Sequence, residues 1–206
     1  MCQVAEFQNV VQITQITTGI AAVGALIFNI TTNIRNTKSA TNQFWLGLRD
    51  RFAEEKRYSA HKRIRENKTI EEWADVDDYL GLFEVCEIML RKKTIRIGAF
   101  RALYGYRLSN LLFHDEIVFY KFVMEVKHWG LLYSLIERTF PKAKPILKKF
   151  RKLSEELSER YINQMGRAKT LSENYALVSN EDQKRLDKTL EELRIPLQEP
   201  LSTGRI

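Results

Sequence analysis

The side chains that come closest to a recognisable chemical pattern in this sequence are Glu125 and His128. A Glu-x-x-His pair on a helix supplies part of the ligand set of a di-iron four-helix bundle, in which carboxylates and imidazoles converge from four helices. The other two histidines, His61 and His114, have no glutamate three residues before them, so the second pair is missing. The sequence therefore predicts no metal site, and we expect His128 to make ordinary hydrogen bonds.

Other catalytic patterns are also missing from the sequence. It contains no glycine-rich phosphate loop, no Gly-x-Ser-x-Gly elbow and no Cys/His nucleophile arrangement. The two cysteines, Cys2 and Cys86, lie far apart and form no Cys-x-x-Cys pair, so neither a disulfide framework nor a zinc site is predicted. We expect Cys86 to be buried and reduced, and we predict neither a cofactor nor an enzymatic reaction.

One carboxylate is predicted to lie in an apolar environment. Glu84 stands between Phe83 and Val85 in a largely apolar helical pattern. A buried carboxylate needs a partner, and Arg101 or Arg107 on the next predicted helix is within reach. We expect a structural ion pair rather than a catalytic carboxylate.

The elements that must position these side chains are predicted to be helices. The 206 residues are 44% hydrophobic and include only nine glycines and four prolines, which favours an all-α fold over a turn-rich β fold. Apolar residues recur at helical spacing after residue 40. They predict helices over about 41–67, 73–93, 95–113, 116–140, 146–165 and 181–193. Thr69 and Glu72 are expected to cap the second of these as a capping box.

The segment before these helices has a different character. No charged residue occurs between Glu6 and Arg35. Val10–Ile30 spans 21 residues, about 31 Å of helix, which matches the ~30 Å hydrocarbon core of a bilayer. Nothing basic precedes it, as a cleaved signal peptide would require. We therefore expect residues 10–34 to form a single transmembrane helix.

The same segment also carries a zipper pattern, which leaves alternatives open. The β-branched residues at heptad spacing are Ile13, Ile16, Ile20, Val23, Ile27 and Ile30. A soluble coiled coil would normally place charges beside this stripe, and here there are none. A soluble oligomerising helix and a buried core helix are the alternatives. Within a membrane, the small-residue row Thr17, Ala21 and Ala25 would allow close helix packing and a homo-oligomer.

Charge predicts the orientation of the chain. The net charge is +7, and residues 35–68 contribute +6 of it, from ten basic and four acidic residues. Basic residues next to a membrane span stay on the cytoplasmic side, where the leaflet is anionic. We therefore expect the N-terminus outside, the remainder in the cytoplasm, and contact with anionic lipid of the inner leaflet through Arg35, Lys38, Arg49 and Arg51.

A second basic region covers residues 142–152. Nucleic acid is the alternative partner for both regions, and we regard it as the less favoured one, because aromatic residues are only weakly interleaved with the basic ones and no nucleic-acid-binding motif is present.

The stretch from Asp77 to Leu112 adds a resemblance. It contains Tyr79, Leu80, Phe83 and Glu84 as a Tyr-Leu-x-x-Phe-Glu pattern and follows the apolar segment and "FWLGLRDRF". With them it resembles a family of small bacterial single-pass membrane proteins catalogued as a domain of unknown function, over roughly residues 10–140. The resemblance implies an N-terminal span and a cytoplasmic helical domain, and it implies no reaction.

These observations predict a membrane-anchored interaction or scaffolding protein of the plasma membrane, with an unknown protein partner. Its expected parts are a short external N-terminus (1–9), a transmembrane helix (10–34), a basic juxtamembrane helix (35–68), a bundle core (69–166), and a short helix with a loose tail (167–206). The whole would be an N-terminal span followed by a bundle of about five to six helices. A soluble nucleic-acid-binding oligomer and a membrane-tethered enzyme are the alternative functions.

Overall fold

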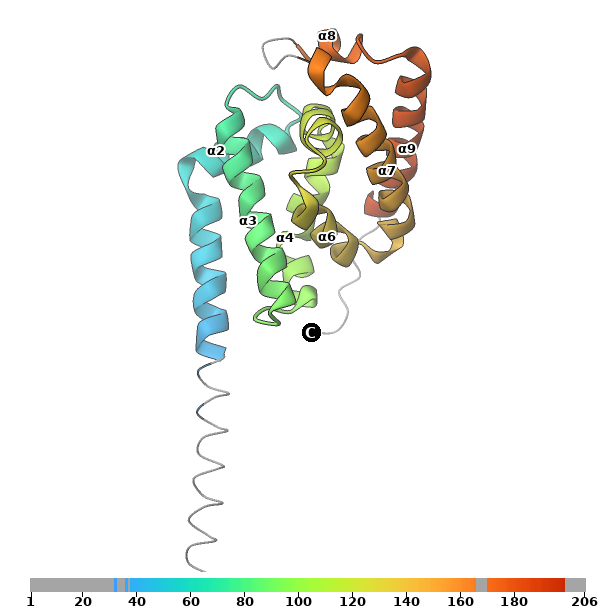
Figure 1. Ribbon diagram of the computed structural model, residues 1–206. Coiled ribbons are helices and arrows are strands. Elements are labelled where there is room, and N and C mark those ends of the chain that lie inside the picture. The colour runs from blue at the N-terminus through green and yellow to red at the C-terminus, as the bar shows by residue number, and fades with distance from the viewer. Residues whose placement is uncertain (1–31, 33–35, 37, 166–169, 199–206) are drawn as a thin grey trace, which may run out of the picture. The chain divides into compact units, whose positions relative to one another are not determined.

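A computed structural model describes residues 32, 36, 38–165 and 170–198 (Figure 1). The chain divides into two units, residues 1–47 and 48–206. In the first unit the described residues are helical, and the rings of Phe44 and Trp45 meet edge to face with centroids 5.6 Å apart. The predicted transmembrane helix, residues 10–34, lies outside the described residues apart from residue 32.

Every regular element among the described residues is a helix and none is a strand, which confirms the predicted all-α class. In the second unit, helical residues 48–53 are followed by α2 (Glu55–Arg65), α3 (Trp73–Arg91) and α4 (Ile97–Phe113). A single turn, α5 (Asp115–Ile117), leads into a π-helix, η1 (Val118–Met124). The remaining elements are α6 (Gly130–Thr139), η2 (Pro141–Ala143), α7 (Lys144–Tyr161), η3 (Ile162–Gln164), α8 (Leu171–Tyr175) and α9 (Asn180–Gln198).

The helices of the second unit share one apolar interior. Helix α3 packs against α2 and α6, while α7 packs against η1 and α9. Phe52 is the centre of an aromatic cluster, with its ring centroid 5.5 Å from that of Tyr79, 5.2 Å from Phe83 and 5.0 Å from Tyr104. Such aromatic contacts contribute about 0.5–1.5 kcal/mol each beyond the burial of their area, so this cluster ties residues 48–53 to α3 and α4.

Two helices end in the same backbone motif. Asn67 after α2 and Lys93 after α3 have φ angles of 49° and 58°. In each case the amide of this residue and the amide of the residue after it donate to carbonyls of the last helical turn. At the end of α3, Lys93 N donates to Leu90 O (3.1 Å) and Thr94 N donates to Met89 O (2.9 Å). This is a Schellman ending, which satisfies terminal carbonyls and turns the chain sharply.

The predicted capping box at Thr69 is wrong. Helix α3 begins at Trp73, with Glu72 in extended geometry and no side-chain cap. The polar groups before it have other partners: Arg63 holds the Glu71 carboxylate at 2.8 Å, and the amide of Ile70 donates to Glu116 at 2.7 Å. Contacts distant in sequence therefore override the local signal.

The predicted continuous helix over 116–140 is also interrupted. Residues 118–124 form the π-helix, in which Glu125 N reaches back five residues to Tyr120 O (3.0 Å), and the helix resumes only at Gly130. The Tyr133 hydroxyl donates to the carbonyl of Phe122, and the Ser158 hydroxyl to that of Met124, both at 2.7 Å. Neighbouring helices thus satisfy carbonyls near the end of η1.

Two predicted segment boundaries differ from the structure. The basic segment 35–68 is not one helix, because the chain is extended at Glu54 (ψ 136°) before α2 begins. The short helix predicted to end near residue 193 continues to Gln198, because α9 packs against α7 and buries Leu186, Leu190, Leu193 and Leu197. In the part of the chain that the structure describes, no helix has the length and apolar content needed to cross a bilayer.

Candidate functional site

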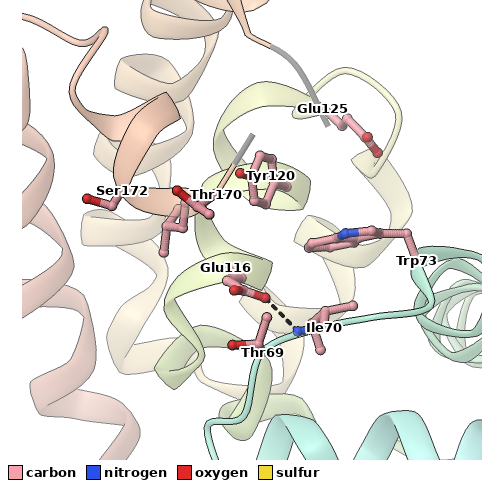
Figure 2. A pocket seen from close by; sticks show the side chains of 9 residues that line it. Thr69, Ile70, Trp73, Glu116, Tyr120, Glu125, Thr170 and Ser172 are labelled. Carbon is pink, nitrogen blue, oxygen red and sulfur yellow. Dashed lines mark hydrogen bonds between the residues drawn. The ribbon is translucent and has the colours of Figure 1, made fainter. Parts of the chain in front are cut away.

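A pocket of about 300 Å³ opens between the segment preceding α3, the helix η1 and the start of α8 (Figure 2). Three stretches far apart in the sequence line it: Thr69, Ile70 and Trp73; Glu116, Tyr120 and Glu125; Thr170, Leu171 and Ser172. Its volume lies at the small end of the ~300–1,000 Å³ range of ligand pockets. The lining combines two carboxylates, two aromatic rings and three hydroxyl side chains.

Trp73 and Tyr120 form the aromatic wall of this pocket. Their rings meet nearly perpendicular, at 75°, with centroids 5.1 Å apart. The Tyr120 hydroxyl accepts a hydrogen bond from Asn174 Nδ2 at 2.8 Å. Burial raises the pKa of Tyr120, and the charges of Glu116 and Glu173 add to that effect against the Asn174 hydrogen bond. The phenol is therefore neutral at physiological pH.

Behind the pocket lies a buried ammonium group. The side chain of Lys121, on η1, is fully buried. Its Nζ forms an ion pair with Asp77 and lies 2.9 Å from Glu125 Oε2. It also lies 5.3 Å from the centroid of the Trp73 ring and 5.8 Å from that of Trp129. Two carboxylates and two indoles thus surround one ammonium, which offsets the cost of removing it from water.

Two backbone amides that border the pocket, those of Ile70 and Thr170, donate to carboxylates. Glu116 Oε2 accepts from Ile70 N, as Figure 2 shows. At the start of α8 a full capping box is present, in which Thr170 Oγ1 accepts from Glu173 N and the Glu173 carboxylate accepts from Thr170 N. Carboxylates therefore hold the amides of Ile70 and Thr170, whereas a hydroxyl oxygen holds the amide of Glu173.

A second cavity of about 360 Å³ adjoins α8 and is mainly apolar. Val118, Phe119, Leu171, Leu186 and Leu190 line it, together with Asp115, Ser172, Tyr175 and Asp187. The Tyr175 hydroxyl donates to Asp187 Oδ1 at 2.5 Å, and burial raises the pKa of Tyr175.

Most of the predicted membrane and oligomerisation residues lie outside the described residues. This holds for Ile13, Ile16, Thr17, Ile20, Ala21, Val23, Ala25, Ile27 and Ile30, and for Arg35 of the predicted lipid-facing set. The other three of that set, Lys38, Arg49 and Arg51, are exposed. The Arg49 guanidinium lies 3.3 Å from Asp50, with both side chains about 70% exposed (70% and 68%), so that pair contributes little to stability.

The predicted ion pair of Glu84 with Arg101 or Arg107 is replaced by other contacts within the described residues. Backbone amides of Leu132 and Leu131 donate to Glu84, and burial nevertheless raises its pKa. Arg101 donates to the carbonyl of Arg138 at 3.1 Å. Arg107 donates to the Tyr106 hydroxyl at 2.9 Å and lies 5.1 Å from the Phe52 ring centroid.

The buried ionic cluster of α3 centres on Glu87 instead. This fully buried carboxylate accepts, at Oε1, from Arg91 Nε (2.8 Å), Ser134 Oγ (2.7 Å) and Arg138 Nε (3.1 Å). Glu87 shares the inward register of Cys86 and Leu90, which is the sequence signal that distinguishes it from Glu84. The cluster joins α3 to α6 and has the character of a structural link.

The histidines and Cys86 also have structural roles. Nδ1 of buried His61 lies 3.0 Å from the Tyr79 hydroxyl, and His114 accepts from Ile117 N through Nδ1 and contacts the carbonyl of Lys68 through Nε2 at 2.9 Å. His128 is exposed, and the described residues contain no cluster of three or more potential metal ligands. Cys86 is buried and free, as predicted, and burial raises its pKa to about 12.

Many cations of the two basic regions pair with carboxylates. Arg57 binds Glu54 and Asp78, and Arg63 binds Glu71. In α7, Lys149 lies 3.1 Å from Glu192 and Arg151 lies 3.1 Å from Glu155. These pairs reduce the positive potential that the basic segments offer to a polyanion.

Comparison of the chain with protein families, with curated proteins and with solved structures gives no match. The resemblance to a single-pass membrane family stays a prediction from the sequence.

Proposed function

We propose that this chain is a single-pass protein of the bacterial plasma membrane, with its N-terminus outside and a cytoplasmic helical domain that serves as an interaction or scaffolding module. The observation that carries the proposal is the 28-residue run without charge, residues 7–34, followed directly by residues 35–68 with a net charge of +6. Such a sequence is more stable across a bilayer than in water, with its basic end on the cytoplasmic side.

Two features of the helical domain bear on the partner of the basic segment. Arg57 and Arg63 are held by carboxylates of the same domain, which lowers the number of cations available for phosphate contacts. Arg49 and Arg51, at the start of the second unit, keep exposed side chains, as contact with anionic headgroups requires. Self-association through the isoleucine stripe and the Thr17, Ala21 and Ala25 row is part of the proposal.

Membrane insertion is tested by fractionation of cells that produce the full chain. We expect the protein to stay in the pellet after extraction with alkaline carbonate. Release into the supernatant contradicts the anchor, and a salt-sensitive gel shift of the released protein with RNA or DNA would then favour the nucleic-acid alternative.

The orientation is tested with the chain's own cysteines. A membrane-impermeant maleimide applied to right-side-out vesicles should label Cys2, which the proposal places outside the membrane. Cys86 should not react, because it is fully buried and burial raises its pKa. Cys86→Ala should keep the label, and Cys2→Ser should lose it. Labelling in inside-out vesicles alone reverses the proposed orientation. Crosslinking in the same vesicles tests self-association, and recovery of monomer alone removes that part of the proposal.

A further inference from the structure

We propose that one end of the helical domain binds the anionic headgroups of the inner leaflet. At this end the connection between α3 and α4 meets the last turn of α6. We call it the cationic end, and its basic residues are Arg91, Lys92, Lys93, Arg96, Arg101 and Arg138. The inference rests on the proposed membrane location, and it adds a contact made by the folded domain to the contact made by the juxtamembrane segment.

Hydrogen bonds bring the cationic end together from three helices. Arg91, in the last turn of α3, and Arg138, in the last turn of α6, both donate to Glu87 Oε1, at 2.8 Å and 3.1 Å. Arg101, in the second turn of α4, donates to the carbonyl of Arg138 at 3.1 Å. Figure 1 shows the α3–α4 connection at the lower end of the domain, opposite to α8.

Few carboxylates neutralise the cationic end. Glu87 is one anion shared by two arginines, whose side chains stay 50% and 47% exposed. Lys92, Lys93 and Arg96 are exposed, and none of them forms an ion pair with a residue that the structure describes. The six basic residues and Glu87 together carry a formal charge of +5.

Two other acidic residues belong to the same helices. Glu84 lies one turn before Glu87 and accepts from backbone amides at the start of α6. Glu137 lies 3.7 Å from Lys144. When Glu84, Glu137 and Lys144 are included, seven positive and three negative charges still leave +4. The attraction to an anionic surface therefore does not depend on which of these neighbours is counted.

Helix dipoles explain only part of this charge distribution. A cation in the last turn of a helix is favourable, which accounts for Arg91. Arg96 and Lys144 lie instead at the starts of α4 and α7, where the helix dipole disfavours a cation, and neither helix has an acidic residue in its first turn. Helix stability therefore does not account for these two cations, whereas a negatively charged partner outside the chain would use them.

The apolar residues at the cationic end favour a lipid surface over nucleic acid. Ile88, one turn before Arg91 and Lys92, is 38% exposed. A side chain of this kind can enter the boundary between headgroups and acyl chains. Phe100, beside Arg101, is fully buried, so it offers no ring on which a base could stack.

The test is fluorescence quenching of the full chain, reconstituted into vesicles, with a dye on a single added cysteine. Cys2→Ser removes the N-terminal thiol, and Cys86 is buried. Gly98→Cys places the dye at the start of α4, where an added Cβ meets no atom within 4 Å. The quencher is a lipid with a nitroxide on its headgroup, and its presence in both leaflets makes the orientation of the chain irrelevant.

We expect the dye on the Gly98→Cys variant to be quenched at least about twofold more strongly in vesicles with about one-third phosphatidylglycerol than in phosphatidylcholine alone. About 1 M sodium chloride should abolish the difference, because it shortens the Debye length to ~3 Å. A dye on the Ala176→Cys variant, at an exposed position after α8, should be quenched equally in both lipids. Equal quenching of the Gly98→Cys dye in both lipids overturns the inference.

A triple variant replaces three exposed cations of this end: Lys92→Gln, Lys93→Gln and Arg96→Gln. It should lose the difference between the lipids, since each cation near an anionic surface contributes roughly fivefold to binding. Thermal unfolding checks that its fold is kept. The matched control replaces three exposed lysines of other elements: Lys127→Gln, Lys184→Gln and Lys188→Gln. The control should keep the difference, and equal losses in the two triple variants contradict the assignment of the cationic end.

Failure of the anchor gives a different result from failure of this inference. If alkaline carbonate releases the chain, the protein is sedimented with preformed vesicles instead. Binding to phosphatidylglycerol vesicles but not to phosphatidylcholine vesicles, weakened about 100-fold in the Lys92, Lys93 and Arg96 variant, then supports the cationic end without the anchor. Tighter binding to RNA or duplex DNA than to these vesicles, with the same loss in that variant, replaces lipid by nucleic acid as the partner and overturns the inference.

Discussion

We expect protonation of His61 to account for a large part of the stability that the protein loses at acidic pH. Its side chain is only 4% exposed, and Nδ1 lies 3.0 Å from the Tyr79 hydroxyl. Burial lowers the pKa of His61 to about 4, with further lowering by the positive charges of Arg107 and Arg65. The Tyr106 ring from α4 also lies near it, with centroids 6.1 Å apart. The folded protein therefore keeps this imidazole neutral.

The sign follows from proton uptake by the two states. In the unfolded chain His61 takes up a proton near its ordinary pKa of about 6.5, while the folded chain takes it up only near pH 4. Between these values the unfolded state binds more protons, so stability is complete above pH 6.5 and falls as the pH drops toward 4. At pH 5 the loss from this one group is about 2 kcal/mol.

The measurement is urea unfolding of the full chain, followed by tryptophan fluorescence at pH 7.5 and pH 5.0. The His61→Gln variant is expected to be less stable than the parent at pH 7.5, because a buried contact is changed. Its further loss on going to pH 5.0 should be about 2 kcal/mol smaller than that of the parent, because the titrating group is gone. His128→Gln is the control at an exposed position and should keep the parent's pH dependence. Equal losses in parent and His61→Gln, within about 0.5 kcal/mol, would refute the assigned role of burial.

Three further substitutions test the interior of the domain, each by urea unfolding at pH 7.5. Lys121→Met should lower the free energy of unfolding by about 3 kcal/mol, because it leaves two carboxylates without their ammonium. The control Lys127→Met changes a lysine that is 65% exposed and should lower it by less than about 0.5 kcal/mol. Equal losses in the two variants would contradict the argument from burial. Tyr133→Phe should lower the free energy of unfolding by about 1–2 kcal/mol, because it removes the hydroxyl that donates to the carbonyl of Phe122. An unchanged stability would mean that another donor takes the place of this hydroxyl. Glu87→Gln should cost about 1.5–3 kcal/mol through the weakened bonds to its three donors, and a more stable variant would show that the buried charge is unfavourable overall.

Local patterns in the sequence predicted much of the fold. The stripe Phe150, Leu153, Leu157 and Tyr161 is buried along α7, as its spacing predicts. Apolar residues at helical intervals also predicted the buried faces of α3 and α4. These predictions succeed because amphipathic periodicity depends only on neighbours within one helix, and burial of that face follows for any packed bundle.

The structure alone decided which polar groups meet. Glu84 and Glu87 are three residues apart on one helix, yet only Glu87 points toward the arginines, because α6 supplies Ser134 and Arg138 on that side. The end of the π-helix is a second example, because hydroxyl groups of α6 and α7 donate hydrogen bonds to the carbonyls of Phe122 and Met124 there.

The candidate pocket belongs to the same class of features. Its walls come from residues 69–73, 116–125 and 170–172, and no short-range pattern relates these stretches. Residue types and their spacing establish the helical class, the inward faces of the helices, and the uncharged and basic segments of the N-terminal region. Tertiary packing decided which distant groups complete the buried charge clusters and the pocket, because these contacts join residues more than 40 positions apart in the chain.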